Sequence, residues 1–221
     1  MKKSLISILV FLFLQMSLFA EGLDGIQYRD DTDNKISIYT LKIQNADQNL
    51  QIHYFSDYEY YTVTNAQSET VSMNFRNSIY DSEYNAVRKS DIISISGKIN
   101  GKIADKEIKI DSGSWYQAAE YLLMNFVLSG EKSCKYWLVS PADLKATKFV
   151  AYNEGIETIT LNKSKVQAYR VRVTLDNWMS VFWSVNYWFR ASDGLYIKFE
   201  GARGAPGTPK TLVEIIGEQE I

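Results

Sequence analysis

The stretch that decides the fold is Val166–Ile216. It opens Val-Gln-Ala-Tyr-Arg-Val-Arg-Val-Thr-Leu-Asp-Asn-Trp, continues Met-Ser-Val-Phe-Trp-Ser-Val-Asn-Tyr-Trp-Phe-Arg and turns at Ala-Ser-Asp-Gly-Leu. Residues two apart in a strand lie on the same face of a sheet. On this period one face is polar, and the apolar face comprises Tyr169, Val171, Val173, Leu175, Met179, Val181, Trp183, Val185, Tyr187, Phe189, Leu195, Ile197 and Phe199. The stretch therefore predicts an antiparallel meander with one buried side.

Shorter alternating runs fill most of the remaining chain. They predict strands at Ile36–Ile43, Leu50–Tyr54, Tyr58–Val63, Val71–Phe75, Ile92–Ile95, Glu107–Ile110, Tyr136–Val139, Lys148–Tyr152, Ile156–Leu161 and Thr211–Ile216. Asn100-Gly101, Asp176-Asn177 and Asp193-Gly194 suit tight hairpin turns, because Asn, Asp and Gly tolerate positive φ. Asn77–Ser90 is polar and has helical spacing. The sequence thus predicts a mainly β protein: a single curved antiparallel sheet, a half-barrel or open barrel, with one main helix packed on it.

The main helix is predicted over Ser114–Ser129. Ser114 is a favourable N-cap, and Gln117 three residues later completes a capping-box pattern. Gly130 is placed to end the helix. Because apolar residues occupy most of its circumference, we expect the helix to be largely buried against the sheet.

The first twenty residues have the pattern of a secretory signal. Lys2 and Lys3 form the basic end, Leu5–Leu14 the apolar run, and Leu18-Phe19-Ala20 the cleavage site. The apolar run is too short for an ordinary membrane span. We therefore expect an exported protein, periplasmic or extracellular, with no stable membrane span after signal cleavage.

The predicted organisation is a signal peptide at 1–20, a flexible lead-in at 21–35 and a single β-rich domain at 36–217. Neither a low-complexity linker nor a clear internal repeat divides the sequence. A chain of this length can bury one substantial core.

Charge and cysteine content narrow the classes of partner. Of the 24 Lys and Arg residues, removal of Lys2 and Lys3 leaves 22 against 26 Asp and Glu, so the net charge is about −4. This balance argues against nucleic acid or an anionic membrane surface as a generic electrostatic partner. Cys134 is the only cysteine, which excludes an internal disulfide and favours a small core residue over a reactive thiol.

The end of the meander resembles a secreted family of unknown function, domain of unknown function 3108. The residues that carry the resemblance are Tyr187-Trp188-Phe189-Arg190, Asp193-Gly194-Leu195 and Lys198-Phe199-Glu200-Gly201. The resemblance implies a curved antiparallel sheet in the periplasm and brings no catalytic residue. The expected architecture is also similar to lipoprotein carriers, whose half-barrel grips acyl chains under a helix, which is an analogy of fold alone.

Asp111 is the one candidate for catalysis that the sequence offers. Asp111-Ser112-Gly113 after an apolar strand resembles the local sequence of an aspartic protease, and Ile215-Ile216-Gly217 resembles its later apolar segment. That mechanism needs two carboxylates that share a proton, so a second copy of Asp111 would have to meet the first across a dimer. The alternative is a strand-to-helix turn in which Asp111 or Ser114 satisfies free N–H groups. We favour the turn and predict no enzyme.

Three further polar features have simpler interpretations. His53 is the only histidine and is predicted on the polar face of its strand, where it makes neither a multi-histidine metal site nor a catalytic triad. Catalysis by Cys134 and His53 together has no supporting motif. The acidic run Asp30–Asn34 lacks the Gly and the final Glu of a calcium loop. We therefore predict no metal and no cofactor.

An aromatic cluster is the most unusual feature of the meander. Strand alternation places Phe182 and Trp188 on the otherwise polar face beside Arg190, and Trp178 precedes them. Large apolar groups on a wet face indicate a covering element, a ligand or a partner. We predict that Phe182, Trp188, Trp178 and Arg190 bind an apolar small molecule, such as a lipid or acyl chain, in a non-catalytic carrier. The alternative is a structural or interaction domain that uses this face on another envelope protein.

Overall fold

The computed structural model describes residues 23–46, 49–204 and 207–217, so the predicted signal peptide lies outside the described residues. Fifteen strands form one sheet in the order β8-β7-β6-β5-β4-β3-β2-β1-β15-β14-β13-β12-β11-β10-β9. The strands are β1 (Leu23–Thr32), β2 (Lys35–Ala46), β3 (Asn49–Phe55), β4 (Glu59–Thr64), β5 (Thr70–Asn77), β6 (Ser82–Lys89), β7 (Ile92–Ile99), β8 (Lys102–Lys109), β9 (Ser114–Trp115), β10 (Ser133–Val139), β11 (Ala146–Leu161), β12 (Ser164–Leu175), β13 (Ser184–Arg190), β14 (Tyr196–Ala202) and β15 (Lys210–Gly217). Every pair of neighbours is antiparallel except β9 and β10, which are parallel.

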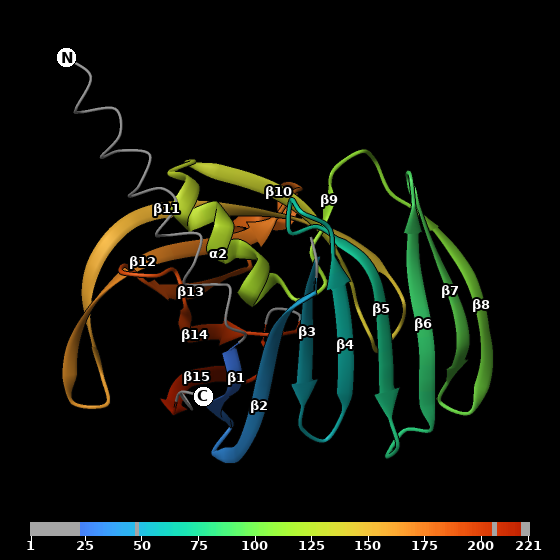
Figure 1. Cartoon of the computed structure of the whole chain (residues 1–221), viewed down its shortest axis with the longest axis horizontal. Coiled ribbons are helices and arrows are strands. Elements are labelled where there is room, and N and C mark those ends of the chain that lie inside the picture. Colours follow the sequence, from blue (N-terminus) through green and yellow to red (C-terminus); the bar gives the residue numbers. More distant parts are fainter. Residues whose placement is uncertain (1–22, 47–48, 205–206, 218–221) are drawn as a thin grey trace.

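The sheet curves around a single α-helix, α2 (Ala119–Ser129), as Figure 1 shows. The helix buries Tyr121, Leu122, Leu123, Phe126 and Val127 against the inner face. The predicted mainly β fold, a curved open sheet with one main helix, is therefore confirmed. Among the described residues, no helix has the length and apolar character needed to cross a membrane.

Side chains nearly close the sheet into a barrel. Ser114 at the β9 end donates its hydroxyl to Glu69 at 2.7 Å, and the Gln117 backbone N–H donates to the Thr70 hydroxyl at 3.0 Å. These contacts join β9 to the start of β5, but no backbone ladder connects the two strands. Strands β6, β7 and β8 continue beyond this junction, so the barrel remains open (Figure 1).

The helix begins five residues later than predicted. Ser114 lies in β9, Ala118 precedes the first helical residue, and no side chain caps the helix. Gln117 is buried: its amide accepts from the Trp115 indole N–H at 2.9 Å and donates to the Val139 carbonyl at 2.9 Å. The capping-box pattern failed because long-range bonds to β10 and β5 outcompete a local cap. The predicted helix end is confirmed, with Gly130 at φ 76°.

The prediction of a flexible lead-in at 21–35 is wrong for residues 23–35, the part that the structure describes. Its residues form β1, which lies between β2 and β15 in the middle of the sheet and carries the fully buried Tyr28. The alternating polar residues of β1 face outward, which hid the strand in the sequence. Asp33 and Asn34 form the hairpin turn to β2, at φ 53° and 61°.

Three more predicted boundaries differ from the structure. The segment Asn77–Ser90 is not helical but contains β6, whose inner face is buried. The two strands predicted at Lys148–Tyr152 and Ile156–Leu161 are one long strand, β11, with a bulge at Glu154-Gly155, because the turn falls at Asn162-Lys163 instead. The long strand expected after Trp178 is interrupted by a 3-10 helix, η1 (Trp178–Val181), whose first N–H groups are capped by Asn177.

Candidate functional site

A row of aromatic rings crosses the inner face of the sheet. Tyr54 of β3, Tyr60 of β4, Phe75 of β5 and Tyr84 of β6 are successive cross-strand partners. The ring centroids of Tyr54 and Tyr60 are 4.9 Å apart, and those of Phe75 and Tyr84 are 5.0 Å apart. The row ends at Gly97 of β7, where a Cβ atom would lie 2.8 Å from the Tyr84 Cβ. Gly97 therefore lets the Tyr84 ring lie directly on the sheet.

The same row continues toward the meander. The Tyr39 ring lies 4.7 Å from that of Tyr54 and 5.0 Å from that of Tyr28. Tyr28 in turn stacks on Tyr196 at 5.2 Å and donates its hydroxyl to the Tyr196 carbonyl at 2.8 Å. Strand register thus joins β14, β1, β2, β3 and β4 in one aromatic wall.

A cavity of about 220 Å³ lies inside the curved sheet, between this wall and the inner face of β10–β13, where the sheet meets the first turn of α2. Six tyrosines line it: Tyr39, Tyr54, Tyr58, Tyr136, Tyr187 and Tyr196. Apolar side chains complete the lining with Leu138, Phe149, Val173, Trp183, Val185 and Phe199, and the charged residues are Glu120 and Arg203. At about 30 Å³ for a water molecule, the space corresponds to roughly seven waters. A mostly apolar cavity with few polar groups is typical of a small-molecule site.

Glu120 projects from the first turn of α2 into this cavity. Its carboxyl accepts a hydrogen bond from the Tyr60 hydroxyl at 3.1 Å, and no other side chain among the described residues pairs with it. Burial raises the pKa of Glu120, because a charge in this apolar space loses its hydration, whereas the hydrogen bonds and the distant Arg203 charge oppose the shift. Glu120 is therefore the one acidic group of the cavity that has no ion-pair partner among the described residues.

Arg203 lies where the cavity reaches the surface. Its side chain is 49% exposed and pairs with the carboxylate of Asp30, whose side chain is 9% exposed. The guanidinium also lies over the Phe199 ring, 5.5 Å from its centroid. The charge of Arg203 is therefore balanced by Asp30. The Trp183 indole N–H donates to the carbonyls of Ala202 and Gly204 at 3.0 and 2.9 Å, which fixes this segment beside the cavity.

The four residues predicted to bind ligand do not lie together. Trp178 and Phe182 form one pair on the surface around η1, with ring centroids 6.3 Å apart and side chains 77% and 65% exposed. Phe182 leaves the sheet because η1 breaks the strand, so the predicted alternation does not apply to it. The pair immediately precedes Trp183, which lines the cavity.

Trp188 and Arg190 lie on the outer face of β13. Trp188 is 7% exposed, and its indole N–H donates to Glu157 at 2.6 Å while Lys198 lies over its ring. The prediction that Trp188 occupies the face opposite Tyr187 is confirmed by the register. Polar side chains of β11 and β14 cover it, and α2 lies on the other face. Arg190 forms a bidentate pair with Asp193 and stabilises the turn to β14.

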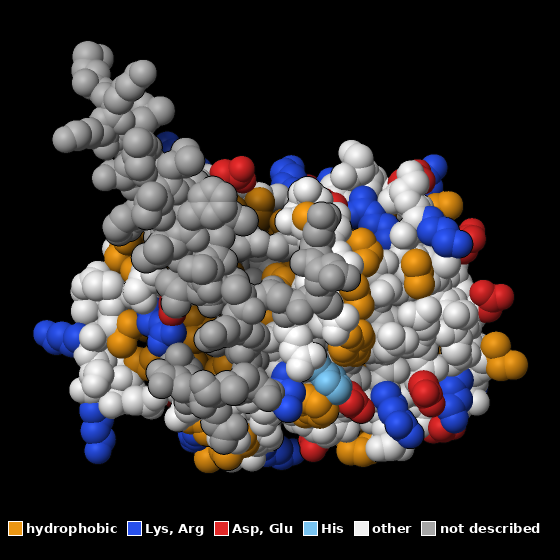
Figure 2. All heavy atoms as spheres, viewed as in Figure 1, with side chains coloured by type: hydrophobic (Ala, Val, Ile, Leu, Met, Phe, Trp, Pro, Cys, Tyr) orange, Lys and Arg blue, Asp and Glu red, His pale blue; other side chains and the backbone are white. Residues whose placement is uncertain are grey.

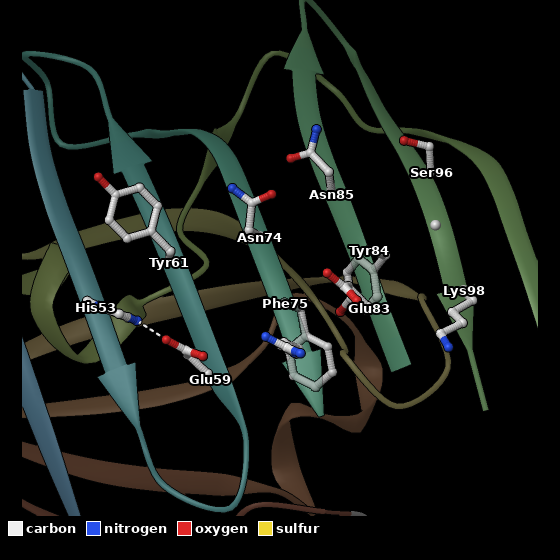
Figure 3. Close-up of a pocket in the computed structure, with 12 residues that line it drawn as sticks. His53, Glu59, Tyr61, Asn74, Phe75, Glu83, Tyr84, Asn85, Ser96 and Lys98 are labelled. Atoms are coloured by element: carbon white, nitrogen blue, oxygen red, sulfur yellow. Dashed lines mark hydrogen bonds and ion pairs between the residues drawn. The ribbon is translucent and has the colours of Figure 1, made fainter. Parts of the chain in front are cut away.

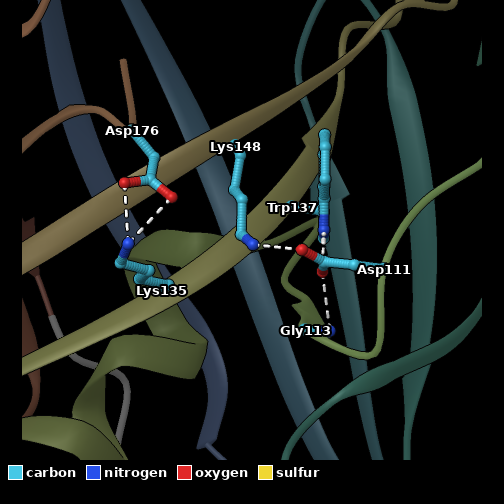
Figure 4. A network of polar contacts seen from close by, with 6 residues as sticks. All are labelled: Asp111, Gly113, Lys135, Trp137, Lys148 and Asp176. Carbon is cyan, nitrogen blue, oxygen red and sulfur yellow. Dashed lines mark hydrogen bonds and ion pairs between the residues drawn. The ribbon is translucent and has the colours of Figure 1, made fainter. Parts of the chain in front are cut away.

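Asp111 is an exposed ion-pair partner in the structure. Its carboxylate accepts from Lys148, from the Trp137 indole N–H at 2.7 Å and from the Gly113 N–H at 2.8 Å (Figure 4). Lys148 in the first place, then the two N–H donors, hold its pKa well below the usual range. A carboxylate held ionised in this way differs from the proton-sharing pair of an aspartic protease. Asp111 does lie in a turn, where it accepts from the Gly113 N–H, but this turn leads from β8 to β9 and not into the helix, so the predicted bonds to helix N–H groups are wrong.

A second hollow, of about 800 Å³, is a shallow trough on the outer face of β3–β7. Tyr61, Asn74, Asn85 and Ser96 form one cross-strand row in it, and His53 pairs with Glu59 at 2.5 Å at one end (Figure 3). Figure 2 shows a mainly uncharged polar surface over this part of the sheet, with charged side chains toward the strand ends. The prediction that His53 faces the polar side is confirmed. Because these groups spread along a sheet face rather than converge, we do not assign the trough as the site.

The remaining candidates are separated from one another. Cys134 of β10 is half-buried, and burial raises the pKa of its thiol to about 12, which disfavours the reactive thiolate. Asp30 belongs to the Arg203 pair and Asp31 to an ion pair with Arg29. In the described ranges, no group of three His, Cys, Asp or Glu side chains is arranged to hold a metal ion.

Sequence reasoning missed Glu120, Arg203 and the tyrosines. A local signal was available: Glu120 is the one charged residue in the mostly apolar segment Ala118–Val127. Tyrosine content was visible in the composition, but which tyrosines meet depends on pairing between strands distant in sequence.

Comparison with known proteins supports the fold. No family model matches the chain, and no curated protein matches its sequence. The structure of a β-barrel-like protein of domain of unknown function DUF1849 from Brucella abortus aligns with a TM-score of 0.59 at 10% identity, covering 88% of this chain and 96% of that chain. The hypothetical lipoprotein YmcC from Escherichia coli aligns at 0.43 and 10% identity, covering 94% and 96%, and a putative outer membrane lipoprotein-sorting protein domain from Vibrio parahaemolyticus at 0.35 and 6%, covering 94% and 89%. The last two alignments are too loose to support any argument.

These comparisons show a β-barrel-like fold of the kind found in a family of unknown function. No comparison identifies the chain as a member of domain of unknown function 3108. The expectation of that fold is confirmed, whereas the particular family stays a prediction.

Proposed function

We propose that the protein is an exported, non-catalytic binding or carrier module that holds an apolar ligand in the cavity between α2 and the inner face of the sheet. The observation that carries the proposal is the 220 Å³ cavity with aromatic and aliphatic walls. A packed interior ordinarily leaves few voids larger than a water molecule, so a space of this size inside a core needs an occupant.

The size of the cavity limits the ligand to a small apolar group or a short acyl segment. Each buried methylene contributes about 0.8 kcal/mol, so six methylenes would contribute roughly 5 kcal/mol before the costs of association. The half-exposed Arg203 marks the side on which a longer ligand would project. Trp178 and Phe182, next to Trp183 in the chain, are the proposed entry surface, which retains two of the residues predicted from sequence.

A titration with 1-octanol, followed by thermal unfolding and by tryptophan fluorescence, to which Trp183 in the cavity wall contributes, tests this proposal. A ligand that binds only the folded state raises the melting temperature. Leu138→Phe adds volume inside the cavity and is expected to abolish the shift. Ile216→Phe, at a 41% exposed position, adds a similar group outside and is expected to leave the shift unchanged. If neither octanol nor a charged amphiphile of the same chain length shifts melting or fluorescence, the cavity is not a ligand site.

The exposed side chains around η1 favour a second candidate, an interaction domain of the cell envelope. Trp178, Val181 and Phe182 are 77%, 78% and 65% exposed, and exposed aromatic clusters are typical of protein interfaces. A Trp178→Ser/Phe182→Ser double variant separates the two candidates. Loss of an envelope protein from cross-linked complexes, with octanol binding intact, would favour the interaction domain.

A further inference from the structure

The cavity contains one ionisable group without a counter-charge, and this feature points to the chemistry of the ligand. Glu120 is half-buried, and its side chain hydrogen-bonds to Tyr60 alone among the described side chains, whereas Arg203 already pairs with Asp30. When the Glu120 carboxyl is ionised, the cavity therefore carries one unbalanced negative charge. A buried charge is costly unless a partner of opposite charge accompanies it.

Tyrosine side chains share the cavity with that carboxyl: Tyr39, Tyr54, Tyr58, Tyr136, Tyr187 and Tyr196 line it, and Tyr60 donates a hydrogen bond to Glu120. Tyrosines from six different parts of the fold are close enough to Glu120 for its charge to raise their pKa values: Tyr39, Tyr58, Tyr60, Tyr136, Tyr187 and Tyr196. The negative face of an aromatic ring attracts an organic cation, and sites for quaternary ammonium groups are built as cages of such rings. A carboxylate inside a cage of tyrosines is thus complementary to an ammonium group.

Resting on the proposed function, we infer that the ligand of this cavity is a small amphiphile with an organic ammonium headgroup, which Glu120 binds as counter-ion while the tyrosines enclose it. The apolar side chains Leu138, Val173 and Val185 of the same cavity hold the short apolar tail. The cavity volume excludes a complete two-chain lipid, so the ligand has a single short chain.

An anionic amphiphile is the competing ligand, and the charges disfavour it. A carboxylate would approach Glu120 without finding a free cation, because Arg203 is bound to Asp30. Arg203 would have to release Asp30, whose side chain would then remain buried and unpaired. A neutral alcohol fits the apolar walls but leaves the ionised Glu120 uncompensated.

Binding of the cation is coupled to the release of a proton from Glu120. In the ligand-free protein burial favours the neutral carboxyl, and an ammonium group favours the ionised one, so binding releases the Glu120 proton. The other titratable groups around Glu120 are these six tyrosines, Tyr54 in the cavity wall, Tyr121 on α2 itself and Arg203 at the mouth. All have raised pKa values and keep their protons between pH 5 and pH 9. A change of affinity in this pH range therefore reports on Glu120.

The test compares three probes of equal chain length: octyltrimethylammonium, 1-octanol and octanoate, titrated calorimetrically at pH 8. We expect octyltrimethylammonium to bind about tenfold more tightly than either of the others, since its headgroup has both the carboxylate and the rings as partners. Its trimethylammonium group does not titrate, so its affinity should rise with pH and level off once Glu120 ionises, while that of octanol stays constant. Octanoate bound as tightly as the cation would overturn the inference.

Glu120→Gln supplies the matched variant, with Glu131→Gln as a control of equal charge change at an exposed position after the helix. We expect Glu120→Gln to reduce the affinity for the cation to that for octanol and to leave octanol binding unchanged. An unchanged cation preference in Glu120→Gln would contradict the inference. If Glu120→Gln does not fold, the pH dependence of the wild-type protein still decides. Failure of all three probes rejects the proposed function, whereas equal binding of all three rejects the ammonium headgroup alone.

Discussion

The guanidinium of Arg203 pairs with the carboxylate of Asp30, 173 positions away in the sequence. The pair joins the segment after β14 to β1, two strands that are separated in the sheet by β15. Asp30 is buried and also accepts from the Thr32 hydroxyl at 2.9 Å. The pair therefore fixes the rim of the cavity next to the aromatic wall.

Removing either partner of this pair should destabilise the fold. Arg203→Met leaves Asp30 buried without its cation, and we expect a loss of about 2–3 kcal/mol, below the 3–5 kcal/mol of a fully buried pair because Arg203 is half-exposed. Urea unfolding of Arg203→Met, Asp30→Asn and the double variant measures the coupling. If the loss in the double variant equals the sum of the losses in the two single variants, Arg203 and Asp30 contribute to stability independently and not as a pair.

Gln117, rather than Ser114, should be the sensitive polar residue at the approach to α2. Gln117→Leu leaves the Trp115 N–H and both backbone groups of Val139 without their side-chain partner inside the core. We expect a loss of roughly 3 kcal/mol or more, since each buried unsatisfied group costs about 1–3 kcal/mol. Ser114→Ala removes one half-buried bond to Glu69 and should cost about 1 kcal/mol or less. A larger effect of Ser114→Ala in urea melts would restore the capping role predicted from sequence.

The tryptophans of the meander should divide into two classes. Trp188→Ala removes a buried indole and its bond to Glu157, so we expect a loss of about 3–5 kcal/mol. Trp178→Ala changes a side chain that is 77% exposed, and its effect should stay within about 0.5 kcal/mol. Chemical unfolding of both variants under identical conditions is the measurement. Comparable losses would mean that η1 packs more tightly than its exposure indicates.

Glu120 should make the folded state less stable as pH rises. The pKa of its carboxyl is raised in the folded state, so the folded protein holds a proton that the unfolded chain loses above about pH 4.3. Stability then falls with rising pH until the folded-state pKa is passed. Glu120→Gln removes this dependence, and its stability relative to wild type should increase between pH 4 and pH 8. Glu131 is exposed, so the stability of Glu131→Gln relative to wild type should not change over this pH range. The same pH dependence of relative stability in both variants would contradict the prediction.

The contribution of Asp111 to stability should change with pH in the opposite direction to that of Glu120. Lys148, Trp137 and Gly113 lower its pKa, so its contribution to stability is complete above about pH 4 and is lost as pH falls through the lowered folded-state pKa. The stability difference between wild type and Asp111→Asn should be constant from pH 5 to pH 8 and shrink at more acid pH. We expect Asp111→Asn to bind octanol as wild type does. A pepstatin-sensitive peptidase activity that disappears in Asp111→Asn would instead make Asp111 catalytic.

The sequence by itself determined the fold class and much of the meander. Period-two alternation identified the buried faces of β12 and β13, because which face of a strand a residue occupies is a property of the backbone. In β14 it failed at Tyr196, which a register shift brings to the cavity together with Phe199. Gly130 was predicted as the helix end for a similarly local reason, since a left-handed residue stops a helix wherever it stands.

Only the tertiary structure decided where the candidate site lies. Tyr28, Tyr39 and Tyr196 come from distant segments, and their stacking requires the register of β1 with β2 and β15. Local signals also failed where long-range bonds were stronger: Gln117 bonds to β10 instead of capping α2, and η1 removes Phe182 from the face that alternation gave it. Glu120 becomes a candidate ligand for a cation because the sheet closes around it, and that environment exists in no single stretch of the chain.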